Sequence, residues 1–171
     1  MPVEPPTILD RPSPYVAGVF TTCPKGFLLH SSRSGLARSE YDEFLSTAAY
    51  CQSNPDGLAW HASIGPGAVA IHMRPQAWGW SARSPASSEW IAVEFAQGRL
   101  GDPISDDQVD AFCAYAVARV LAVWPQMPLA FVFHSWLPAG IKDGKTDPYP
   151  IGEPDGDMFL DKIVARLRPR W

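Results

Sequence analysis

Short apolar runs, separated by glycine, proline and serine, recur along the chain. Runs of this length that are rich in β-branched and aromatic residues and bounded by turn-forming residues are typical of β-strands. Six of them predict strands: Val16–Phe20, Phe27–Ser32, Trp60–Ile64, Ala68–Met73, Trp90–Ala96 and Leu129–Ser135. The third and fourth runs are separated only by Gly65, Pro66 and Gly67, which predicts a hairpin between them.

Three other segments repeat their apolar residues with the helical period. The first begins after a candidate cap at Ser39, the second carries an apolar stripe from Val109 to Leu121, and the third runs from about Asp157 to Leu167. Ser105 and Gln108 form a capping-box pattern at the start of the second helix. Strands that alternate with helices predict an α/β fold, a single domain with a mixed central sheet of about five or six strands flanked by helices.

Composition and charge limit the extent of this domain, its partners and its location. Residues 1–15 are proline-rich and are expected to form an extended N-terminal segment, which leaves residues 16–171 as the domain proper. The net charge of −4 argues against nucleic acid as a partner. No apolar run is long enough to span a membrane, and no signal-peptide pattern opens the sequence, so we expect a monomer that is cytoplasmic as synthesised.

Two histidines stand where predicted strands run into loops. His30 follows Phe27-Leu28-Leu29, and His134 follows Phe131-Val132-Phe133. Such positions are rigid and open to solvent, although a half-buried histidine bonded to a backbone carbonyl is the structural alternative for each. Asp147 follows in a Gly- and Pro-rich loop. Two histidines and one aspartate form a ligand set of the kind that catalytic zinc uses, with one coordination position left open.

Glu94 lies in the apolar run Trp90–Ala96. A carboxylate there is costly unless it is paired, hydrogen-bonded or close to a cation. Two interpretations stay open: an ion pair or the exposed face of an edge strand, and a general base beside a metal.

The order of these segments resembles the zinc-dependent N-acetylmuramoyl-L-alanine amidases, a family that includes phage amidase-type endolysins, anhydro-muropeptide amidases and peptidoglycan recognition proteins. The resemblance covers roughly residues 16–168. It rests on the strand ending in His30, the Trp60–Gly67 hairpin, Trp78–Ala82 in place of an aromatic-His-Ala element, Ile91–Glu94, the helix opening at Ser105 and Gln108, His134–Pro138, and Lys145-Thr146-Asp147-Pro148. The last of these is the most specific.

The resemblance implies a zinc ion held by His30, His134 and Asp147. It implies that Glu94 activates the attacking water and that Lys145 stabilises the oxyanion, with Lys142 as a competitor for that role. The bond cleaved would be the amide between the lactyl group of N-acetylmuramic acid and L-alanine, in peptidoglycan or its soluble muropeptide fragments.

Four residues are candidates for substrate binding. They are His61, Trp60, Trp80 and Arg83. His61 is alternatively a packed strand histidine, and Arg83 a solvated surface residue. The sequence departs from the family at Trp60, Trp80 and Tyr149, and residues 139–143 are expected to lengthen the loop between His134 and Asp147.

Two other functions remain open at this point. One is a non-catalytic peptidoglycan-binding module of the same fold, and the other is an unrelated metallohydrolase that uses the same ligands. An amidase of this kind fits a phage endolysin that is released to the cell wall, or a cytoplasmic recycling enzyme.

Overall fold

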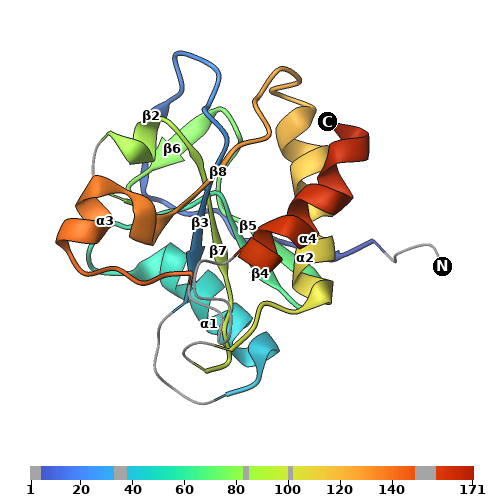
Figure 1. Ribbon diagram of the computed structural model, residues 1–171. Coiled ribbons are helices and arrows are strands. Elements are labelled where there is room, and N and C mark those ends of the chain that lie inside the picture. The colour runs from blue at the N-terminus through green and yellow to red at the C-terminus, as the bar shows by residue number, and fades with distance from the viewer. Residues whose placement is uncertain (1–4, 33–37, 83–84, 100–101, 149–156) are drawn as a thin grey trace.

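A six-stranded mixed sheet lies at the centre of the computed structural model, which describes residues 5–32, 38–82, 85–99, 102–148 and 157–171 (Figure 1). The strand order is β1-β5-β4-β7-β3-β8. The strands are β1 (Thr7–Asp10), β3 (Phe27–Ser31), β4 (Ala62–Gly65), β5 (Ala68–Ile71), β7 (Ile91–Phe95) and β8 (Phe131–Phe133). The predicted α/β fold with a mixed sheet is confirmed.

Four adjacent strands, β4, β7, β3 and β8, run parallel, so their carboxyl ends meet at one edge of the sheet. β5 returns antiparallel to β4 through the predicted hairpin, where Gly67 adopts a φ of 61° that favours glycine. A separate two-stranded sheet joins β2 (Val16–Val19) to β6 (Ala77–Gly79). The apolar run at residues 16–20 therefore forms a strand outside the central sheet.

The N-terminal segment contributes a strand that the sequence analysis missed. β1 pairs in parallel with β5, from Thr7 opposite Ala68 to Asp10 opposite Ile71. Backbone bonding continues beyond the strand, because the Ser13 N–H donates to the His72 carbonyl at 2.9 Å. The described part of this segment is extended where β1 forms, and it is hydrogen-bonded to the sheet. The division of the chain at residue 15 stays a prediction.

The helices begin where the sequence places their caps. α1 (Glu40–Ser53) is capped by Ser39, whose Oγ accepts the Asp42 N–H, and α2 (Asp106–Tyr115) opens with the complete capping box. α2 continues as a π-helical segment over Ala116–Leu121, and α4 (Asp157–Leu167) closes the fold. α3 (Pro138–Lys142) is helical where only a longer loop was expected. Short 3₁₀ turns cover Ala86–Ser88, His134–Trp136 and Arg168–Arg170.

The helices lie on opposite faces of the sheet. α2 and α4 lie together on one side, and α1 and α3 lie on the other (Figure 1). Alternate strand residues supply the main core beneath α2 and α4, which contains Phe27, Leu29, Ile64, Val69, Ile91, Val93, Phe95, Phe112, Phe159 and Ile163. No helix in the described part of the chain is long and apolar enough to cross a membrane.

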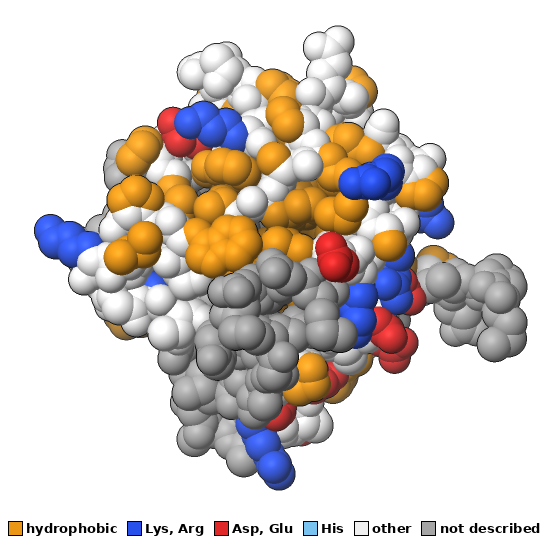
Figure 2. Space-filling model, viewed as in Figure 1, with side chains coloured by type: hydrophobic (Ala, Val, Ile, Leu, Met, Phe, Trp, Pro, Cys, Tyr) orange, Lys and Arg blue, Asp and Glu red, His pale blue; other side chains and the backbone are white. Residues whose placement is uncertain are grey.

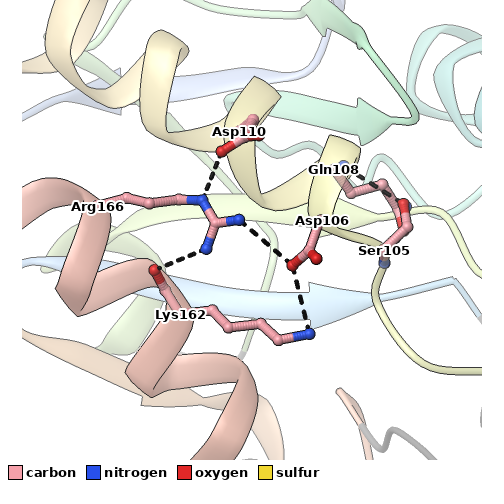
Figure 3. A network of polar contacts seen from close by, with 6 residues as sticks. All are labelled: Ser105, Asp106, Gln108, Asp110, Lys162 and Arg166. Carbon is pink, nitrogen blue, oxygen red and sulfur yellow. Dashed lines mark hydrogen bonds and ion pairs between the residues drawn. The ribbon is translucent and has the colours of Figure 1, made fainter. Parts of the chain in front are cut away.

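Ion pairs join α2 to α4 at the surface (Figure 3). Arg166 bonds to Asp110 and Asp106, and Lys162 lies 3.4 Å from the same Asp106 carboxylate. These charged residues flank the apolar contact between the helices. Hydrophobic side chains form a broad area on the face of the molecule seen in Figure 2, and charged side chains are scattered among and around them.

Candidate active site

A pocket opens at the edge of the sheet where the parallel strands end. Its lining combines strand-end residues with one face of α1 and the segment that precedes Pro148. The lining residues are His30, Ser31, Ser32, Glu43, Ser46, Thr47, Tyr50, Leu58, Trp60, Ser81, Glu94, His134, Lys145 and Asp147. Residues from distant parts of the sequence therefore meet in one concave site.

Both candidate histidines and Asp147 converge in this pocket. Asp147 Oδ2 lies 3.3 Å from His30 Nδ1 and 3.1 Å from His134 Nδ1. The two imidazole rings are 4.5 Å apart between centroids, and one ligand atom from each of the three residues falls within 4.8 Å of the others. Imidazole nitrogen and carboxylate oxygen are donors that zinc accepts, so the three side chains fit a divalent metal of that type.

The secondary structure explains how the three side chains reach each other. His30 is the fourth residue of β3, and His134 begins the 3₁₀ turn directly after β8, the next strand in the sheet. Asp147 is tied to this region because its carbonyl accepts the Ser135 N–H at 3.1 Å. The Asp147–Pro148 peptide bond is cis.

Burial and mutual contact set the charge states of these groups. Burial opposes ionisation of Asp147, but hydrogen bonds from His134 and His30 lower its pKa well below the usual range. Burial also lowers the pKa of His30, although its contact with Asp147 acts in the opposite direction. His30 Nε2 is buried without a hydrogen-bond partner among the described residues. A neutral imidazole beside a carboxylate is the protonation state that metal binding requires.

Glu94 and Lys145 stand on the walls of the same pocket. Glu94 is the register partner of His30 across β3 and β7. Burial raises the pKa of Glu94 well above its ordinary value, and the nearby charges of Asp147 and Glu43 raise it further, whereas Lys145 lowers it. Three carboxylates thus line the described part of the pocket, and a bound cation would favour the ionised form of Glu94. Lys142, at the end of α3, is not part of the lining.

One wall of the pocket was missed by sequence reasoning. Glu43, Ser46, Thr47 and Tyr50 of α1 recur at helical spacing and face the site. Glu43 is 2% exposed and pairs with Arg38 Nε at 3.2 Å. In the sequence, the one available signal was that these polar residues repeat with the helical period of 3.6 residues. Polar residues with that period are ordinarily interpreted as the solvent-exposed face of a helix.

The four substrate-binding candidates differ in their position relative to the pocket. Trp60 lines the pocket. Trp80 is 45% exposed, lies outside the lining and stands edge-on to Trp78 with centroids 5.2 Å apart. Arg83 lies outside the described residues, as does Tyr149.

His61 lies outside the lining as well. Its Nε2 is 2.8 Å from the Ala77 carbonyl, and its Nδ1 accepts the Ala92 N–H at 3.0 Å. This is the geometry of the packed strand histidine, the alternative that the sequence left open. Because both ring nitrogens are already bonded to the backbone, a role for His61 in substrate binding gains no support from the geometry.

The fold has clear counterparts among solved structures. No protein-family model and no curated protein sequence matches the chain. A mutant endolysin from Bacillus subtilis aligns with a TM-score of 0.67 at 16% identity over 92% of this chain and 98% of its own. A selenomethionine AmpD derivative gives 0.65 at 15% identity over 97% and 99%. The N-acetylmuramoyl-L-alanine amidase LysC from Clostridium intestinale gives 0.57 at 12% identity over 95% and 98%. The chain therefore has the fold of AmpD and of these endolysins and amidases, over nearly its whole length.

Proposed function

We propose that this protein is a zinc-dependent N-acetylmuramoyl-L-alanine amidase acting on peptidoglycan or its fragments. The observation that carries the proposal is the convergence of His30 Nδ1, His134 Nδ1 and Asp147 Oδ2 at one end of a pocket whose walls also hold Glu94 and Lys145. The similarity of fold to named endolysins and amidases supports the same reaction.

Each residue has a defined task in this reaction. His30, His134 and Asp147 hold the zinc ion, which when bound supplies a Lewis acid that polarises the amide carbonyl and promotes ionisation of water. Glu94 accepts a proton from the attacking water and passes it to the leaving amine of L-alanine. The Lys145 ammonium, on the pocket wall, stabilises the negative charge that develops on the carbonyl oxygen.

The direct test is to incubate the zinc-loaded protein with muramyl dipeptide, N-acetylmuramoyl-L-alanyl-D-isoglutamine, and to identify products by mass spectrometry. We expect free N-acetylmuramic acid and the dipeptide, and we expect a chelator to abolish both. The His30→Ala and His134→Ala variants should lose bound zinc and activity together. Lys145→Ala should lose turnover while it retains zinc, and Lys142→Ala is the matched control that should keep both.

Other outcomes separate the alternatives. Tight binding of muramyl dipeptide by a protein that takes up no zinc would replace the amidase by a non-catalytic binding module. Full activity in His30→Ala would contradict the proposed metal site.

A further inference from the structure

A chain of buried hydrogen bonds runs from the pocket wall to the N-terminal segment. Trp60 Nε1 lies 2.9 Å from Ser63 Oγ, Ser63 Oγ lies 2.8 Å from His72 Nε2, and His72 Nδ1 lies 2.7 Å from the Arg11 carbonyl oxygen. Trp60, Ser63 and His72 are 6%, 0% and 2% exposed. Of these three side chains only Trp60 lines the pocket.

The direction of every proton in this chain follows from its two ends. The Arg11 carbonyl only accepts, so His72 Nδ1 carries a proton and donates it. The neutral ring then has an unprotonated Nε2, which accepts the Ser63 hydroxyl. The Ser63 oxygen is left to accept the indole N–H of Trp60, which can only donate. Burial, which lowers the pKa of His72 to about 4, agrees with this neutral ring.

The hydrogen-bond chain also fixes which part of the Trp60 indole faces the pocket. The indole has one polar atom, and that atom is bonded on the Ser63 side. Tyr50 stacks on the indole at 6.5 Å and an interplanar angle of 23°, and the His72 ring meets it edge-on at 6.0 Å. The part of Trp60 that faces the pocket therefore offers carbon atoms and no hydrogen-bond donor.

We propose that Ser63 and His72 are positioning residues that hold Trp60 as an apolar wall against which a C–H-rich part of the ligand packs. The pyranose face, the lactyl methyl and the alanine methyl of a muropeptide have this chemistry. The inference rests on the proposed function for the identity of the ligand, whereas the hydrogen-bond chain stands on its own geometry. The Arg11 carbonyl makes the N-terminal segment part of the support.

The hydrogen-bond chain from Trp60 to Arg11 is tested first, by NMR. In the unmutated protein, the ¹⁵N spectrum should show His72 as the Nδ1–H tautomer, and an Nε2–H tautomer would overturn the proposal. Ser63→Ala should speed exchange of the Trp60 indole proton at least tenfold, with Trp60→Phe assigning the resonance. Trp124 and Trp171, whose indoles donate to backbone carbonyls at 2.9 and 2.7 Å, serve as internal controls that should not change. An unaltered exchange rate of the Trp60 indole proton would contradict the proposed hydrogen-bond chain.

The positioning role is tested with muramyl dipeptide and the zinc-loaded protein. Ser63→Ala should raise KM, and the Kd measured by titration, roughly 3–10-fold, with kcat within about twofold and zinc content unchanged. Ser88→Ala, which changes an exposed serine whose Oγ donates to the Pro85 carbonyl, is the matched control and should behave as the parent. Faster indole exchange with unchanged KM and Kd would overturn the positioning role. A parent protein that binds muramyl dipeptide without cleaving it would contradict the amidase proposal alone, because the Kd comparison would still be made.

Discussion

The two faces of the central sheet are built from the same strands and differ in chemistry. On β7, Ile91, Val93 and Phe95 point toward α2 and α4, whereas Ala92 and Glu94 belong to the other face. The first face is closed by phenylalanine rings, among them Phe95 against Phe112 at 5.6 Å and against Phe159 at 5.1 Å. It is a continuous apolar core in which burial raises the pKa of Cys113 and of Tyr115, so both side chains stay neutral.

The second face carries polar residues beside two smaller apolar clusters, one around Leu28 and Ala92 and one around Phe44 and Ala70. Gly65 lies so close to Phe44 of α1 that a Cβ there would come within 2.5 Å of that ring. His30, Ser63 and Glu94 share this face, and toward the carboxyl ends of the strands it opens into the pocket. The period of two along each strand thus keeps the core beneath α2 and α4 apart from the face that carries the candidate site.

The largest effect that would test this separation is expected at Glu94. Glu94→Gln should lower kcat by about 10²–10⁴-fold, since it removes the proposed general base, while zinc stays bound. The metal-free variant should be more stable than the parent in chemical denaturation, because a half-buried carboxylate, whose pKa is raised by desolvation and by the charge of Asp147, is replaced by a neutral amide. Kinetics, metal analysis and unfolding curves together check the prediction.

The matched control for this variant is Glu89→Gln. Glu89 is a partly exposed carboxylate paired with Lys25 at 2.8 Å. The Glu89→Gln substitution should change neither turnover nor the free energy of unfolding by more than a small amount. Unchanged turnover in Glu94→Gln would mean that Glu94 is only structural.

Local pattern was enough to predict the elements whose residues carry their own signal. The caps formed by Ser39 and by Ser105 with Gln108 depend only on residues within one helical turn. The Gly65–Gly67 turn likewise predicts the hairpin from local sequence. β1 had no such signal. It lies among prolines that the edge of a sheet tolerates, and its strand conformation depends on pairing with β5.

α3 was missed for a related reason. It is a single short turn of helix that begins at Pro138, so its composition is that of a loop. The site divides in the same way. His30 and His134 became candidates because strand ends are visible in the sequence, and Asp147 because its loop follows His134 and completes a zinc-type ligand set. The role proposed for Lys145 came only from the resemblance.

The Trp60–Ser63–His72 chain could not be predicted from the sequence. Ser63 lies in β4, Trp60 comes just before that strand, and His72 directly follows β5. Only the register of the folded sheet brings them together, and with them the Arg11 carbonyl of the N-terminal segment. The same holds for the α1 wall, since the sequence does not show which face of a helix meets a pocket.

On the core face, Phe112→Ala gives the next largest effect. Phe112 is fully buried and packs edge-on against Phe27 at 5.0 Å. The variant should lose about 3–5 kcal/mol of unfolding free energy, through lost burial and a residual cavity. At temperatures where it remains folded, its KM and zinc affinity should match the parent, because the sheet separates Phe112 from the pocket. A specific loss of zinc in the folded variant would show that the two faces are coupled.

The smallest effect concerns a polar residue that is structural, His61. Burial lowers its pKa from 6.5 to about 4, and although its bonds to Ala77 and Ala92 oppose this shift, protonation would set an Nδ1–H against the Ala92 N–H. The unfolded chain therefore binds a proton between these values that the folded protein does not. The stability linked to His61 is complete above pH 6.5 and is lost as the pH falls toward 4, by about 3 kcal/mol in all.

His61→Gln isolates this contribution from those of the other titrating groups. We expect the difference in unfolding free energy between parent and variant, measured with chelator present, to shrink steadily as the pH falls from 6.5 to 4. It should stay constant from pH 7 to 8, where both states of His61 are neutral. A difference that is the same at all pH values would mean that His61 titrates alike in the folded and unfolded chains, and the backbone bonds at its two nitrogens would then have no influence on its charge.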